Sequence, residues 1–142
     1  ATSDANETTI SVTEPTADRT WTLPDKSGTF QSLEYTILDK TTNYTVVAAD
    51  AGKIITNAGA GAITTMTLPE ASTVIGKPFK FAVAQALSMN VDVATGDQIV
   101  PTTNAAGDMA WADAAGESIT LVAIDNTNFV EIGKSGSWSD GN

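Results

Sequence analysis

The chain has 142 residues, a formal net charge of −10 at pH 7, and neither cysteine nor histidine. Disulfides, thiolate metal sites, zinc hydrolysis and the histidine-dependent chemistry of serine and cysteine nucleophiles are therefore excluded. Because Arg19 is the only arginine, the sequence offers no basic face, and we expect neither nucleic acid nor an anionic membrane as a partner.

The first third, residues 1–43, is predicted to be an extended arm of short strands and turns. Apolar residues alternate at 8–13 and at 20–23, and turn residues follow at 24–28. The arm has too few large apolar side chains to form a core of its own, so we expect it to bury them against another molecule. The expected assembly residues are Ile10, Val12, Trp21, Leu23 and Phe30.

The body, residues 44–142, is predicted to be all-β. A hairpin is expected from 44–48 and 53–57, because a tight turn separates two apolar runs. Residues 118–124 are apolar on both faces, which is typical of a central strand, and should pair with 129–133 across a turn. Further strands are expected at 63–68, 80–85, 90–94 and 99–101. Strands at this spacing predict a small antiparallel β-sandwich or barrel, with the arm extended from it.

Two tryptophans are candidates for glycan contact. Trp111 lies in a weakly apolar stretch, 105–115, that is predicted to be a loop, and Trp138 lies in a polar tail. An exposed indole ring can stack on a sugar. Trp111 is equally consistent with a place at a core edge or a subunit interface.

The acidic residues show no pattern that predicts a metal site or catalysis. Several aspartates could supply oxygen ligands for calcium, but none has the spacing of a calcium-binding loop. We expect solvated turn residues, no metal and no cofactor. No two acids stand out as a pair for glycosidic cleavage, so we expect no catalytic residues and no enzyme. The aspartates considered are Asp92, Asp97, Asp108, Asp113 and Asp125.

One phrase, T-[WM]-T-L-P-[DE]-x-S, occurs twice, at 20–27 and at 65–72. Its alternating apolar residues suit a strand, its proline ends the pairing, and its acid can accept hydrogen bonds from turn amides. The two copies can therefore be two strand ends that share no function.

Three stretches resemble proteins of tailed bacteriophages. ISVTEPTADRTWTLPDKSGTF, at 10–30, resembles the threonine-rich TLPD-x-SGT element of fibre and virion surface proteins. The stretch 44–72, with G-x-x-F-x-F at 76–81, and the stretch 118–138 resemble a small β domain that is common in phage virion proteins. Together these stretches cover most of the chain. The resemblance implies a β-rich homotrimer, but with only two TLPD elements the chain departs from a long fibre.

We therefore expect a virion structural protein on the particle surface, either a capsid decoration protein or a short head fibre. Its partners would be two further copies of itself and the major capsid protein or another virion protein. One alternative is a receptor- or carbohydrate-binding module of a tail fibre or spike, with a host surface glycan as its partner. A third reading is a secreted bacterial β-module that binds carbohydrate outside any virus.

Overall fold

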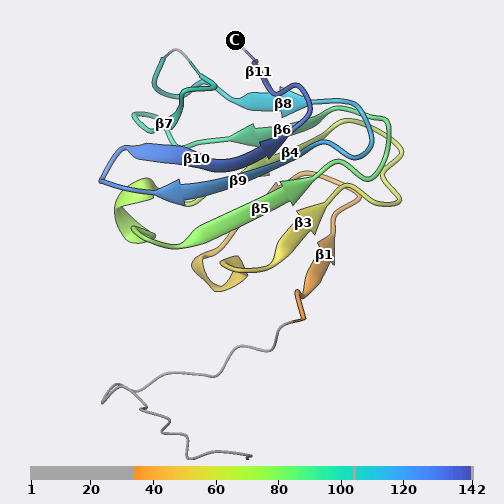
Figure 1. The fold of residues 1–142 in the computed structure, drawn as a ribbon, viewed down its shortest axis with the longest axis horizontal. Helices are drawn as coiled ribbons and strands as arrows, with labels where there is room; N and C mark the ends of the chain where they lie inside the picture. The colour runs from red at the N-terminus through yellow and green to blue at the C-terminus, as the bar shows by residue number, and fades with distance from the viewer. Residues whose placement is uncertain (1–33, 104, 142) are drawn as a thin grey trace, which may run out of the picture. The chain divides into compact units, whose positions relative to one another are not determined.

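Two β-sheets packed face to face form the part of the chain described by the structure, a computed structural model that covers residues 34–103 and 105–141 (Figure 1). The expected all-β sandwich is confirmed. No helix among these residues is long and apolar enough to cross a membrane. In spatial order, the six-stranded sheet contains β1 (Ile37–Asp39), β3 (Ile54–Thr56), β5 (Pro78–Ala82), β9 (Ser118–Ala123), β10 (Asn128–Ser135) and β7 (Gln98–Val100). The five-stranded sheet contains β11 (Ser139–Asp140), β8 (Ala110–Ala112), β6 (Met89–Asp92), β4 (Thr64–Thr67) and β2 (Tyr44–Thr45).

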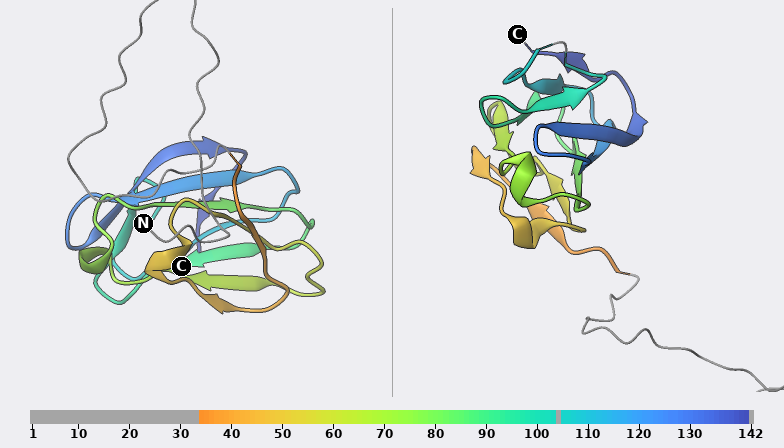
Figure 2. Two further views of the ribbon diagram at one scale, coloured as in Figure 1. Left: turned by 90° about the horizontal axis from the view of Figure 1, so that it is seen from below. Right: turned by 90° about the vertical axis from the view of Figure 1, so that its left-hand side faces the viewer.

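The chain crosses between the sheets at almost every connection (Figures 1 and 2). From β1 to β9, each strand lies in the other sheet from the strand before it. Strands two apart in the sequence therefore become parallel neighbours, as in β1–β3–β5 and β2–β4–β6. Antiparallel pairs join β5 to β9, β9 to β10, β6 to β8 and β8 to β11. The sandwich was expected to be antiparallel, whereas its sheets are mixed, because most connections change layer and do not fold back within one sheet.

The hairpin predicted from 44–48 and 53–57 is wrong for the same reason. β2 pairs with β4, whereas β3 pairs with β1 and β5 in the opposite sheet. The connection contains a short 3-10 helix, Ala48–Asp50. The buried Asp50 carboxylate accepts hydrogen bonds from the Val47 backbone N–H at 3.1 Å and from the Tyr44 hydroxyl at 2.8 Å. These bonds hold the chain as it leaves one sheet for the other.

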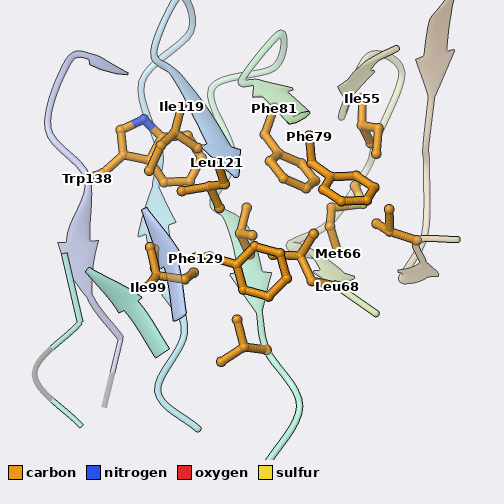
Figure 3. Packing of buried hydrophobic residues seen from close by; sticks show 14 of the residues in the cluster. Ile55, Met66, Leu68, Phe79, Phe81, Ile99, Ile119, Leu121, Phe129 and Trp138 are labelled. Atoms are coloured by element: carbon orange, nitrogen blue, oxygen red, sulfur yellow. The ribbon is translucent and has the colours of Figure 1, made fainter. Parts of the chain in front are cut away.

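The core lies between the sheets and fixes their register (Figure 3). Alternate residues of β5 and β9 point inward and meet the ring of Phe129 from β10. Full burial of such a side chain contributes about 1.5–3 kcal/mol, and a slip of one residue would turn the inward set to solvent. β9 is central, between β5 and β10, and its predicted pairing with the following strand is confirmed. The central inward residues are Phe79, Phe81, Ile119, Leu121 and Phe129.

Two segments predicted to be irregular contain strands, and the predicted arm contributes a strand to the sandwich. β1 lies in the predicted arm, yet it pairs with β3, so the boundary expected at residue 44 is too late. β8 lies in the predicted loop 105–115, and β11 lies in the predicted polar tail and pairs with β8. Each of these strands has two or three residues, which is too short for alternation to reveal it.

Candidate interaction surface

The five expected assembly residues precede Glu34 and lie outside the described residues. Their role stays a prediction, and the surfaces described here belong to the body alone. These residues are Ile10, Val12, Trp21, Leu23 and Phe30.

Trp138 belongs to the core. Its side chain is 6% exposed and packs within the buried cluster between the sheets (Figure 3). The prediction that Trp138 contacts a glycan is therefore wrong, because a buried ring offers no face for a sugar. Pairing of β11 with β8 brings the polar tail back to the sandwich, and Trp138 enters the core just before β11.

Trp111 lies half-buried on the outer face of the five-stranded sheet. Its neighbours across the strands are Asn90 and Ser139. The indole N–H donates to the backbone oxygen of Asp140 at 3.1 Å, and a β-carbon on Gly141 would lie 3.0 Å from Cδ1 of the ring. The ring thus holds β11 at the edge of the sheet. Glycan contact by Trp111 stays a prediction, with the polar N–H already engaged within the chain.

The carboxylates with the strongest interactions organise turns. Among residues 34–103 and 105–141, no group of three or more histidine, cysteine, aspartate or glutamate residues is placed to hold a metal ion. Asp97 accepts the Ala71 backbone N–H at 2.8 Å. Hydrogen bonds from the Thr127 N–H and the Asn128 side chain lower the pKa of Asp125, which therefore stabilises its turn as a carboxylate.

Glu117 joins two distant segments through backbone hydrogen bonds. Its carboxylate accepts the N–H groups of Ser137 at 2.5 Å, Ala114 at 2.9 Å and Asp113 at 3.2 Å. The bond from Ser137 contributes most to lowering the pKa of Glu117. All three donors belong to the backbone, so this carboxylate has a structural role.

The outer face of the six-stranded sheet carries an apolar row that we call the valine row. Pro78 of β5 is paired with Val122 of β9, Val122 with Val130 of β10, and Val130 with Val100 of β7. Paired residues point to the same face of a sheet, and the adjacent residues Phe79, Leu121, Phe129 and Ile99 are buried on the inner face. The four members of the row are half-buried and form a continuous strip across four strands.

Further apolar residues extend the strip. Ile124 follows Val122 on the same face and is 56% exposed, and Ile132, at the irregularity of β10, is 62% exposed. The next row of the face contains Ile37, Ile54, Lys80 and Thr120. The Lys80 ammonium lies over the Tyr35 ring, 3.6 Å from its centroid. Contiguous exposed apolar surface is a feature of protein interaction sites, so this face is the candidate interaction surface of the described residues.

The outer face of the five-stranded sheet has the opposite character. One row contains Thr65, Asn90, Trp111 and Ser139, and the other contains Thr45, Thr67 and Asp92. These side chains are polar except for the indole ring. The strand positions of this face are thus more polar than the valine row, although Val47 and Ile63, just beyond β2 and β4, are also exposed.

The valine row was missed at the level of the sequence, although one signal was present. Residues 118–124 are apolar on both faces, which was interpreted as burial on both sides of a central strand. In the structure, Ile119 and Leu121 are buried, whereas Val122 on the other face is only half-buried. The second apolar face of this stretch is the one sequence feature that corresponds to the valine row.

No family model matches the chain, and a comparison with curated proteins finds no relative.

Proposed function

We propose that this protein is a non-enzymatic structural protein of a bacteriophage virion that forms a homotrimer and decorates the particle surface. The observation that carries the proposal is the apolar outer face of the six-stranded sheet, on a chain whose net charge is −10. Exposure of such an apolar face to water is unfavourable, and association with another copy would remove it from water. The TLPD-containing motifs support placement on a virion.

In this proposal the chain has two working parts. The body associates with other copies, and residues 1–33 anchor it to capsid subunits through the few large apolar residues of the arm. An extended segment can add a strand to an open sheet edge and place alternate side chains in pockets of its partner. Three anchors on one trimer act together, because binding of the first raises the effective concentration of the others.

The direct test is binding to capsids that lack this protein, measured by cosedimentation. Trp21→Ala and Leu23→Ala in the full chain should each lower capsid affinity by about tenfold or more, as expected for a buried anchor. Thr22→Ala, between them, is the matched control and should bind normally. Absence of the chain from purified virions, examined by peptide mass spectrometry, would contradict the proposal.

The carbohydrate-binding alternative predicts a different result. The isolated protein would bind polysaccharide from the host surface, and substitution of Trp111 would abolish that binding. On the structural proposal, a glycan array gives no specific signal with the wild-type chain.

A further inference from the structure

We propose that the valine row is the surface through which copies of this chain associate, with three six-stranded sheets facing a common threefold axis. The inference rests on the proposed function for self-association and adds the surface, the occupant and the geometry. The occupant is the body of a second and a third copy of this chain.

The first argument is charge. The valine row, formed by Pro78, Val122, Val130 and Val100, contains no ionisable side chain, although acidic residues outnumber basic ones 17 to 7 in the chain. The outer face of the other sheet includes Asp92, and Asp140 lies at its edge. The four side chains of the row bring no charge to a contact between two copies, although Lys80 lies in the next row of the face. Contact through the five-stranded sheet would bring carboxylates together.

The second argument is the fit of three sheets around an axis. Four strands carry the row, and at about 4.8 Å per strand they make a side roughly 19 Å wide. In an equilateral prism with sides of that width, the axis lies about 5.5 Å from each sheet, close to half of the roughly 10 Å that separates packed sheets. Valine and proline side chains can therefore fill the centre without leaving a channel.

The chain's own first 33 residues are the competing occupant. Ile10 and Val12 have only a carboxylate within three residues, whereas Trp21 and Leu23 each have both a carboxylate and a cation, Arg19 or Lys26, within that distance. The valine row itself has no cation to pair with carboxylates; the Lys80 ammonium lies over Tyr35, and the Lys134 ammonium is paired with Glu131 at 3.1 Å. A second copy brings an uncharged strip to an uncharged strip. The carboxylates concerned are Glu7, Glu14, Asp18 and Asp25.

The first experiment measures mass by light scattering for the full chain and two variants. Val130→Asp would place three carboxylates at the axis and should convert trimers of the 14.7 kDa chain into monomers. Thr45→Asp adds the same charge on the exposed edge strand of the other sheet and should remain trimeric. Far- and near-ultraviolet circular dichroism confirms that each variant is folded.

The second experiment does not depend on how well the aspartate variant folds. Because the chain has no cysteine, Val122→Cys in the full chain can carry a single benzophenone–maleimide cross-linker. Irradiation of a mixture of unlabelled and 15N-labelled chains should join residue 122 to residues 78–130 of a different copy. Thr45→Cys, labelled in the same way, should give no such product.

The possible results test the interface and the proposed function separately. A trimeric Val130→Asp variant, a cross-link from residue 122 to residues 1–33, or no cross-link at all would overturn the valine row as the interface, while a trimeric wild-type chain would keep the proposed function. A monomeric wild-type chain would overturn both.

Discussion

The carboxylate of Glu117 occupies the space in which a side chain on Gly136 would lie. A β-carbon at Gly136 would clash with Cγ of Glu117 and would lie 2.5 Å from its Oε1. Gly136 also has a φ of +80°, in the left-handed region that favours glycine. This close approach lets Glu117 reach the Ser137 N–H and tie the end of β10 to the turn before β9.

Replacement of Gly136 should therefore destabilise the protein. Gly136→Ala forces a left-handed alanine, which costs about 1–3 kcal/mol, and it also displaces the Glu117 carboxylate from its backbone donors. Gly61→Ala is the matched control, because nothing lies within 4 Å of a β-carbon at Gly61 and its φ is outside the left-handed region. Urea unfolding of both variants tests this. Equal urea midpoints for Gly136→Ala and wild type would show that the contact between Gly136 and Glu117 does not contribute to the free energy of unfolding.

Asn57 is expected to be the most sensitive polar residue of the core. Its Oδ1 accepts the N–H groups of Ala84 and Gln85 at 2.7 and 2.9 Å, and its Nδ2 donates to the oxygens of Gln85 and Leu87 at 3.3 and 3.0 Å. This fully buried amide thus holds the connection between β5 and β6.

Asn57→Ala removes four hydrogen bonds and should lower the free energy of unfolding by about 2–4 kcal/mol, since partners near the surface regain some bonds to water. Asn126→Ala, at an exposed turn position, should change it by less than about 0.5 kcal/mol. Thermal unfolding measures both. A loss at Asn57 no larger than at Asn126 would contradict the role assigned to the amide.

Stability should fall in acid because of Asp50. Burial alone would raise the pKa of Asp50, but hydrogen bonds from the Val47 N–H, Lys53 and Tyr44 outweigh it and lower the pKa from 3.8. The unfolded chain therefore binds this proton more readily than the folded chain, so the contribution is complete above the unfolded pKa and is lost as the pH falls through the folded value.

Asp50→Asn should accordingly be less stable than wild type at pH 7, and the difference should shrink below about pH 4. Urea unfolding from pH 3 to pH 7 follows both proteins. A constant difference across this range would mean that the ionised carboxylate of Asp50 does not supply the stabilisation.

Trp111 should act as a structural residue. Trp111→Ala removes the ring that packs against Gly141 and the donor to Asp140, so amide protons of residues 139–141 should exchange faster with solvent while those of β9 keep their protection. Unchanged exchange in residues 139–141, together with saturable quenching of Trp111 fluorescence by host polysaccharide, would favour the glycan role.

Local patterns predicted the parts of the fold that local contacts form. The β9–β10 hairpin follows from two apolar runs separated by a polar turn, and Asp125 closes that turn with bonds to residues two and three positions ahead. The turn before β3 looks similar in sequence, yet there the chain crosses to the other sheet. No local sequence feature distinguishes a hairpin turn from a connection that crosses to the other sheet, because the outcome depends on which distant strands are free to pair.

The valine row and the burial of Trp138 could not be predicted from the sequence, because both depend on pairing between distant strands. Val100, Val122 and Val130 come from three strands, and they form a row only once the register of β7, β9 and β10 is known. Trp138 stands in a polar tail, and it becomes a core residue only because β11 pairs with β8, which is itself too short to predict.

The mass of the wild-type chain in solution, measured by multi-angle light scattering over a series of concentrations, tests the central claim of self-association most directly. The account predicts a species of three chains of 14.7 kDa each. A single 14.7 kDa species at every concentration would contradict it.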